Sequence, residues 1–202
     1  MHHTIFNTPV IKTILRGVSF FFLKILGWKG SGALPAAPHY ILVVAPHTSN
    51  WDLFYGIILA FALGLDPYFL AKKQLFTWPF GPLVKWLGGM PIDRSVSGNT
   101  VERVVELFQK NPRLVLAVAP EGTRSRASYW KTGFYHMAVG AGVPILLAFI
   151  DYEKKTGGPG PLIVPTGNID EDMKIIRKFY QDVAGRYSDK TGPVSILHKN
   201  ES

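Results

Sequence analysis

A strand that leads through a short polar turn into a helix constrains this chain more than any other feature. Residues 40–45 are apolar and rich in β-branched side chains, which predicts a buried strand. Residues 53–63 are apolar over a length typical of a buried helix. Between them, residues 46–52 read Pro-His-Thr-Ser-Asn-Trp-Asp. Ligands bind at the carboxyl ends of strands in open α/β sheets, so this heptapeptide is a candidate site.

The heptapeptide contains a histidine and an aspartate. On one helix His47 and Asp52 would lie about 140° apart around the axis. They can meet if His47 ends the strand and a helix begins near Asn50, which puts Asp52 in a first helical turn that favours a carboxylate. That carboxylate would fix the imidazole tautomer and make His47 a general base. The alternative is that Ser49-x-x-Asp52 is a capping box, with Asp52 as a helix cap and His47 as an ordinary strand-end histidine.

A second polar turn follows another predicted strand, over residues 114–119. Residues 120–126 read Pro-Glu-Gly-Thr-Arg-Ser-Arg. The backbone N–H groups of such a turn and the guanidinium of Arg124 are suited to a phosphate group. The turn lacks the Gly-Lys-Ser/Thr of a P-loop, so nucleoside triphosphate chemistry is not indicated. The alternative is a surface turn with solvated arginines.

Two further basic residues follow predicted strands. Arg94, in the pair Asp93-Arg94, ends a turn and short strand over residues 88–94, and Lys73 follows a strand over residues 67–71. An arginine so placed can present a forked guanidinium to a phosphate, although an ordinary surface ion pair is the alternative. The remaining expected elements are helices over 100–110, 129–141 and 169–187, a strand over 145–150, a Gly/Pro-rich loop over 153–161 and an edge strand over 162–164. The apolar run 76–87 is either a core helix or a surface for an acyl chain or a membrane.

The first 30 residues combine apolar and basic character. Apolar residues recur with a helical period over residues 10–28, and Lys12, Arg16 and Lys24 interrupt them. No acidic residue precedes Asp52. The uninterrupted apolar stretches are too short for a spanning helix, which needs about 20 mostly apolar residues. The pattern predicts an amphipathic helix in the membrane interface; the alternative is a helix packed on the protein's own core.

The composition limits the classes of binding partner that we expect for this chain. The formal net charge is +8 and the pI about 9.7, which suits phosphorylated substrates, an anionic membrane surface, an acidic carrier protein or nucleic acid. Nucleic acid is disfavoured because the aromatic residues lie in apolar runs and are not interleaved with Lys and Arg. The absence of cysteine excludes disulfides, a thiol nucleophile and a zinc–thiolate site.

Four stretches in order resemble the glycerolipid acyltransferase superfamily, of the 1-acylglycerol-3-phosphate acyltransferase type. Residues 47–52 match its H-x-S-x-x-D motif, 88–94 match G-x-x-x-I-D-R, 120–125 match P-E-G-T-R-S, and 143–145 match the start of the fourth block. The similarity covers about residues 40–190. The chain departs from the family pattern at Pro46, Ala119 and Leu147.

The resemblance implies an α/β fold with a mixed, largely parallel sheet flanked by helices and an N-terminal amphipathic membrane-interface helix. It divides the chain into a membrane-interface segment over residues 1–30, an acyltransferase domain over 38–190 and a flexible tail over 191–202. The implied association with the membrane is peripheral or monotopic, on the cytoplasmic face of the cell membrane.

The resemblance also implies an activity. A fatty acyl group would pass from acyl-CoA or acyl carrier protein to the hydroxyl of a lysophospholipid, above all 1-acylglycerol-3-phosphate, with no metal or cofactor. Carried over by position, His47 is the catalytic base and Asp52 orients it. The residues expected to bind the acceptor phosphate are Arg94, Arg124, Gly122 and Thr123, with Glu121 shaping the pocket and Lys73 a weaker candidate. The alternatives are another lysolipid or polar-lipid acceptor, a thioester hydrolase in which His47 activates water, and a non-catalytic lipid-binding protein.

Overall fold

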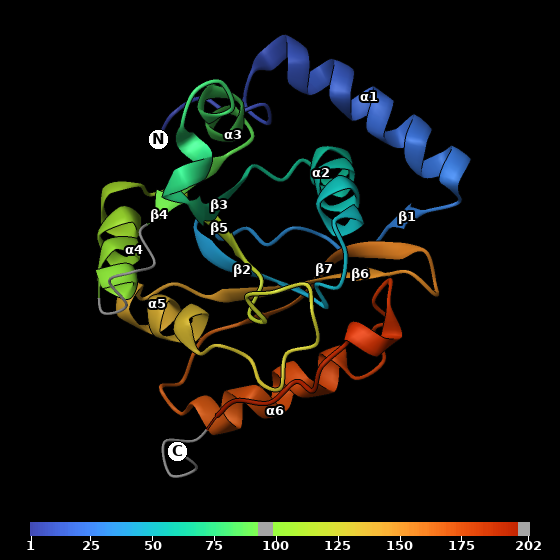
Figure 1. Cartoon of the computed structure of the whole chain (residues 1–202). Helices are drawn as coiled ribbons and strands as arrows, with labels where there is room; N and C mark the ends of the chain where they lie inside the picture. Colours follow the sequence, from blue (N-terminus) through green and yellow to red (C-terminus); the bar gives the residue numbers. More distant parts are fainter. Residues whose placement is uncertain (93–98, 198–202) are drawn as a thin grey trace.

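The structure, a computed structural model, describes residues 1–92 and 99–197, and a twisted sheet forms its centre (Figure 1). Within these residues the sheet has seven strands in the order β1-β7-β6-β2-β5-β3-β4. The strands are β1 (Lys29–Gly30), β2 (Tyr40–Ala45), β3 (Pro67–Lys72), β4 (Gly89–Ile92), β5 (Val115–Val118), β6 (Ile145–Asp151) and β7 (Thr156–Ile163). Among these strands, β6 and β7 pair antiparallel and the other neighbours pair parallel, so the predicted mixed, largely parallel sheet is confirmed.

Helices cover both faces of the sheet (Figure 1). The α-helices are α1 (Pro9–Leu26), α2 (Trp51–Leu63), α3 (Gly81–Trp86), α4 (Asn99–Lys110), α5 (Gly133–Ala141) and α6 (Ile169–Tyr180), with short 3₁₀ helices η1 (Lys73–Phe76) and η2 (Ser188–Lys190). Side chains alternate along β2: Ile41 and Val43 belong to the core beneath α4, α5 and α6, whereas Tyr40 and Leu42 face the other side. The helix α2 covers that other side, and α1 lies outside α2.

Only the end of β7 was predicted, as an edge strand over 162–164, because residues 153–161 were expected to form a loop. Glycine and proline are depleted in strands, and this segment is rich in both. The glycines are needed where other chain segments come close. A Cβ on Gly158, whose φ is 153°, would lie 1.9 Å from the carbonyl oxygen of Ser31, and one on Gly160 would lie 2.2 Å from the ring of Phe179. The segment therefore pairs as a strand between β1 and β6 and also contacts α6.

Two predicted helices are shorter in the structure, and the apolar run 76–87 is not one continuous helix. After η1 ends at Phe76, this run contains the short helix α3, because Pro79 and Pro82 cannot lie inside a longer helix. The helix expected over 129–141 begins at Gly133. The helix expected over 169–187 ends at Tyr180, and the chain after it turns back towards β2.

The tail over residues 191–202 was expected to be loose, but hydrogen bonds hold it in place as far as the described residues extend, to residue 197. The N–H of Trp130 donates to the carbonyl of Ser195 at 2.7 Å, and Nε of Arg177 donates to the carbonyl of Val194 at 3.0 Å. These contacts hold the segment after η2 against α6.

The helix α1 is apolar on two sides. Leu23 is buried, and Ile11 and Leu15 are partly buried against the body of the protein. The opposite side exposes Val10, Ile14, Val18, Phe21 and Ile25. Among the described helices, none combines the length and hydropathy that crossing a membrane requires.

Candidate active site

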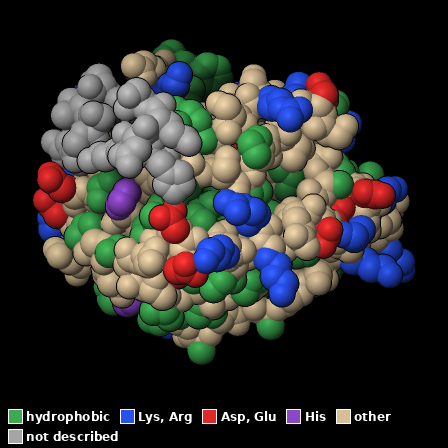
Figure 2. All heavy atoms as spheres, turned by 90° about the horizontal axis from the view of Figure 1, so that it is seen from below, with side chains coloured by type: hydrophobic (Ala, Val, Ile, Leu, Met, Phe, Trp, Pro, Cys, Tyr) green, Lys and Arg blue, Asp and Glu red, His purple; other side chains and the backbone are tan. Residues whose placement is uncertain are grey.

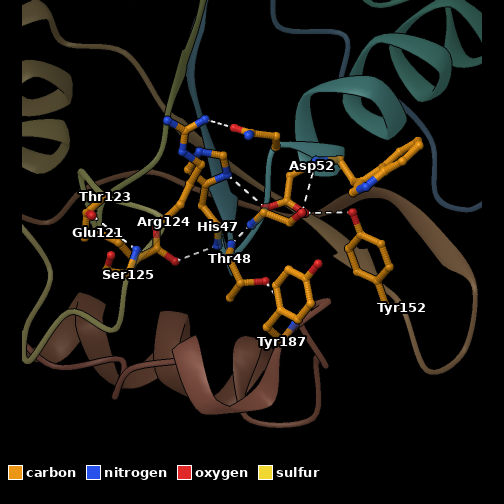
Figure 3. Close-up of polar contacts among 12 residues, drawn as sticks. His47, Thr48, Asp52, Glu121, Thr123, Arg124, Ser125, Tyr152 and Tyr187 are labelled. Atoms are coloured by element: carbon orange, nitrogen blue, oxygen red, sulfur yellow. Dashed lines mark hydrogen bonds and ion pairs between the residues drawn. The ribbon is translucent and has the colours of Figure 1, made fainter.

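The two predicted catalytic side chains meet at the carboxyl end of β2 (Figure 3). Nδ1 of His47 lies 3.0 Å from Oδ2 of Asp52, and α2 begins at Trp51, just after the turn. An ionised carboxylate can only accept hydrogen bonds, so Nδ1 donates, and in the neutral imidazole Nε2 is then the nitrogen that can accept a proton. The His47 side chain is 28% exposed and that of Asp52 only 4%. The geometry is that of a general base whose partner is shielded from water.

Asp52 accepts three further hydrogen bonds. Its Oδ2 accepts from the backbone N–H groups of Thr48 and Ser49, each at 2.8 Å, and its Oδ1 accepts from the hydroxyl of Tyr152 at 2.7 Å. Burial acts to raise the pKa of Asp52, but the hydrogen bonds from His47, Tyr152 and the Ser49 N–H outweigh it and lower the pKa below its usual value. The carboxylate therefore stays ionised beside the imidazole.

Glu121 joins the two predicted turns. Its Oε1 accepts a hydrogen bond from the backbone N–H of His47 at 3.0 Å. The residue is 8% exposed, and burial raises the pKa of its carboxyl above the usual value. Its Oε2 is buried and has no hydrogen-bond partner among the described residues. Glu121 thus points inward and holds the backbone of the catalytic turn.

Arg124 reaches across from the turn after β5 to the start of α2. Its Nη1 donates to the side-chain oxygen of Asn50, which brings the predicted phosphate-binding turn beside the catalytic turn (Figure 3). Gly122 has a φ of 64°, and a Cβ there would lie 3.0 Å from Nζ of Lys131. The hydroxyl of Thr123 accepts from the N–H of Ser125 at 3.2 Å, which tightens the turn.

Of the other two predicted binding residues, the structure describes only Lys73. Lys73 begins η1 at the carboxyl end of β3, two strands from β2 on the same edge of the sheet, and within the described part of the chain no hydrogen bond or ion pair joins it to the dyad. Arg94 lies outside the described residues, as does Asp93.

Sequence reasoning missed Tyr152, which lies just after β6. Its ring packs edge-on against Trp28 and Tyr55, with ring centroids 5.1 and 5.5 Å apart. Burial and the hydrogen bond to Asp52 raise the pKa of Tyr152, so the hydroxyl stays protonated and donates. Its position directly after a strand of the sheet was the one available signal, because the carboxyl ends of parallel strands share an edge.

The arrangement is suited to moving a proton. It offers a base at Nε2 of His47, a fixed and ionised partner, and cationic and N–H donors within the neighbouring turn. Within the described residues, no group of three His, Asp or Glu side chains is placed to hold a metal ion.

Comparison with known proteins identifies the family. The family model described as Acyltransferase matches residues 28–150, which include both strand-end turns. The chain belongs to the acyltransferase family. The resemblance found in its motifs is thereby confirmed.

Relatives of this acyltransferase carry a more specific name. The 1-acyl-sn-glycerol-3-phosphate acyltransferase of Salmonella typhimurium is 35% identical over 112 residues, which are 52% of this chain and 44% of that protein. The enzyme of the same name from Escherichia coli is 34% identical over 113 residues, with the same coverage. The mouse 1-acyl-sn-glycerol-3-phosphate acyltransferase alpha is 28% identical over 146 residues, 69% of this chain and 50% of that protein. The aligned segments span about half the length of these relatives.

A solved structure shares the fold of this acyltransferase. The crystal structure of the 1-acyl-sn-glycerophosphate (LPA) acyltransferase PlsC from Thermotoga maritima superposes with a TM-score of 0.62. The match covers 88% of this chain and 81% of that one at 19% sequence identity. The predicted glycerolipid acyltransferase fold is confirmed by this likeness.

Proposed function

We propose that this acyltransferase moves a fatty acyl group from an acyl thioester to the free hydroxyl of a lysophospholipid, with 1-acylglycerol-3-phosphate as the acceptor and phosphatidic acid as the product. The His47–Asp52 dyad carries this proposal, because it supplies a base for a hydroxyl. The names of the relatives support the acceptor.

The chemistry balances with the residues of the site. Nε2 of His47 takes the proton of the acceptor hydroxyl while its oxygen attacks the thioester carbonyl. Collapse of the tetrahedral intermediate breaks the carbon–sulfur bond and forms the ester. The protonated His47 then gives its proton to the departing thiolate, and Asp52 stabilises the imidazolium in between. These steps need no metal or organic cofactor, and we propose that none is used.

We propose that the acceptor phosphate binds beside the turn after β5. Arg124 is fixed near the dyad by Asn50, and Gly122 and Thr123 lie in the same turn. Arginine and turn N–H groups suit a phosphate. Glu121 contributes by holding the backbone of His47, and Arg94 and Lys73 remain candidates for the same anion.

The lipid acceptor points to a membrane surface. We propose that the protein associates with an anionic membrane without spanning it, on the cytoplasmic face, where the soluble donors acyl-CoA and acyl carrier protein are made. Nucleic acid is not expected as a partner. The exposed apolar side of α1 and its basic residues support association with an anionic membrane.

A direct assay tests the proposal. Purified protein is incubated with acyl-CoA or acyl carrier protein donors and a panel of lysolipids, and the products are read by mass spectrometry. His47→Ala should lower transfer by about 10² to 10⁴, the usual contribution of general-base catalysis. His136→Ala, which removes an exposed histidine on α5, is the matched control. Near-normal turnover in folded His47→Ala, or thioester hydrolysis without any acylated lipid, would overturn the proposal.

A further inference from the structure

The segment after α6 lies directly on the catalytic turn. The N–H of Tyr187 donates to the hydroxyl of Thr48 at 3.3 Å, and the N–H of Tyr152 donates to the carbonyl of Ala184 at 2.9 Å. Between them, a Cβ on Gly185 would lie 2.9 Å from a side-chain carbon of Thr48 and 3.1 Å from the ring of Pro46. This close approach fixes the position of the next residue, Arg186.

The guanidinium of Arg186 lies over three aromatic rings. Its central carbon is 5.2 Å from the ring centroid of Trp51 and 5.7 Å from those of Tyr152 and Tyr187. Cation–π contacts of this kind orient a guanidinium and leave its N–H edge available. Arg186 is exposed, and no carboxylate of the described residues forms an ion pair with it. Its charge is thus held in place but not neutralised.

This cation lies next to the dyad. Trp51 is the neighbour of Asp52 in the chain, and the hydroxyl of Tyr152 donates to Oδ1 of Asp52. One aromatic side chain therefore separates the guanidinium of Arg186 from the catalytic carboxylate. Arg124 reaches the same helix start through Asn50. Two arginines that lie far apart in the sequence therefore contact the start of α2. Arg124 contacts the N-cap residue Asn50, and Arg186 contacts the first residue, Trp51.

We propose that Arg186 binds a phosphate group of a substrate of this enzyme. A guanidinium presents forked N–H donors that match phosphate oxygens. Arg186 shares a hydrogen bond with the side chain of Tyr187 but has no ion pair among the described residues, so an arriving anion breaks no ion pair. The phosphate belongs either to the lysolipid or to the pantetheine arm and nucleotide of the thioester donor. The identity of the substrates rests on the proposed function; the binding of phosphate does not.

Steady-state kinetics test the assignment. Arg186→Gln should raise the KM of one phosphorylated substrate roughly tenfold with kcat little changed, the lower end for a lost charge-assisted contact. Arg186→Lys keeps the charge but loses the planar stacking on the aromatic rings. Its KM should lie between that of the wild type and that of Arg186→Gln. Arg113→Gln removes an exposed arginine at the amino end of β5, the opposite edge of the sheet, and should leave both KM values unchanged.

Phosphate-free substrates distinguish the two sources. If the lysolipid phosphate is bound, Arg186→Gln has no effect on KM with a monoacylglycerol acceptor. If the donor phosphates are bound, Arg186→Gln has no effect on the KM of an acyl thioester of N-acetylcysteamine. Unchanged KM values for both phosphorylated substrates, or equal losses with the phosphate-free ones, would overturn the assignment.

A binding measurement keeps the inference testable if no transfer is detected. In protein with ¹⁵N-labelled arginine, the Nε–H signal of Arg186 is assigned by its absence from the Arg186→Gln spectrum. Titration with glycerol 3-phosphate, or with coenzyme A if the donor phosphates are bound, should shift this signal in a saturable way and leave that of Arg113 in place. An Arg186 signal that moves with neither ligand would refute phosphate binding, whatever the assay of acyl transfer shows.

Discussion

Asp52 binds both the turn before α2 and the proposed catalytic histidine. Its Oδ2 accepts the N–H groups of Thr48 and Ser49 and also lies 3.0 Å from Nδ1 of His47. The sequence left two interpretations of Asp52 open, a capping box with Ser49 and a partner for His47. In the structure the carboxylate accepts from the N–H of Ser49, as in a capping box, and also contacts His47, so its position is compatible with both. The capping bonds fix the carboxylate in the orientation that the imidazole needs.

The hydroxyl of Tyr152 should set the efficiency of the dyad. Tyr152→Phe leaves Oδ1 of Asp52 buried without its donor, and it removes one of the hydrogen bonds that lower the pKa of Asp52. A hydrogen bond to a charged group contributes about 1.5–3 kcal/mol, so we expect kcat to fall at least about tenfold with KM unchanged. Tyr40→Phe, a buried tyrosine at the opposite end of β2, is the control. A kcat equal to that of the control would remove Tyr152 from the site.

The buried carboxyl of Glu121 should make stability depend on pH. Because burial raises the pKa of Glu121, the folded state binds this proton more tightly than the unfolded state, and the free energy of unfolding falls as pH rises through the raised pKa. Glu121→Gln can still accept from the N–H of His47 but cannot ionise. We therefore expect the difference between the Tm of the variant and that of the wild type to shift in favour of the variant as pH rises above about 4.5, by about 2–4 °C for each kcal/mol. A Tm difference that is constant with pH would contradict this.

At the scale of elements, the sequence predicted those strands and helices whose form depends on residues that are close together in the chain. The strand β2, the helix α2 and the turn between them follow from apolar runs with a polar break, and so His47 and Asp52 could be paired in advance. Most of the strand β7 could not be predicted. Its glycines are needed for close contacts with Ser31 and Phe179, and these residues are distant in the sequence.

The same limit applies to the site. Tyr152 meets Asp52 across 100 residues of sequence, and Tyr187 meets Thr48 across 139. Such contacts depend on the order of the strands and on where the chain turns after α6. The sequence reveals the first residues of each turn but not the side chains that fold onto them.

Two glycines in different elements should respond oppositely to alanine. Gly158→Ala places a Cβ 1.9 Å from the carbonyl oxygen of Ser31, so β1 and β7 must separate, at a cost of about 1–3 kcal/mol or more. Gly17 lies within α1 with nothing within 4 Å of a Cβ, so Gly17→Ala should stabilise the protein by about 0.5–1 kcal/mol. Urea denaturation measures both. Equal effects at the two positions would show that the β1–β7 contact is not part of the folded protein.

At the scale of the whole molecule, the two sides differ in surface chemistry. The face that carries α6 shows basic and acidic side chains scattered among one another (Figure 2). On the opposite side, α1 exposes large apolar residues, and its exposed charges, Lys12, Arg16 and Lys24, are all basic. Near the start of α1 the N–H of Ile5 donates to the carbonyl of Trp86, so α3 lies beside it, and the segment leading into α3 exposes Trp78 and Phe80. An apolar surface with basic charges suits an anionic bilayer.

Removing the first 30 residues would not test this surface cleanly. Leu23 is buried, and Trp28 stacks on Tyr55 with ring centroids 4.1 Å apart and contacts Tyr152. Deletion would open the core beside the dyad. The exposed side of α1 can instead be changed alone.

Replacing three exposed apolar residues of α1 should release the protein from membranes and leave it folded. Ile14→Ser, Phe21→Ser and Ile25→Ser together remove side chains whose burial is worth about 1.5–3 kcal/mol each, so partial insertion alone predicts at least a roughly hundredfold loss of vesicle binding. The control replaces exposed apolar residues elsewhere, with serine at Val139, Val164 and Ile175. Cosedimentation with anionic vesicles measures binding, and circular dichroism confirms folding. High salt should weaken the wild type without releasing it, because the basic residues are screened whereas apolar burial is not. Equal vesicle binding by the α1 variant and the control would show that α1 is not the membrane-contacting surface. The lysolipid would then have to reach the turn at His47 from another face of the protein.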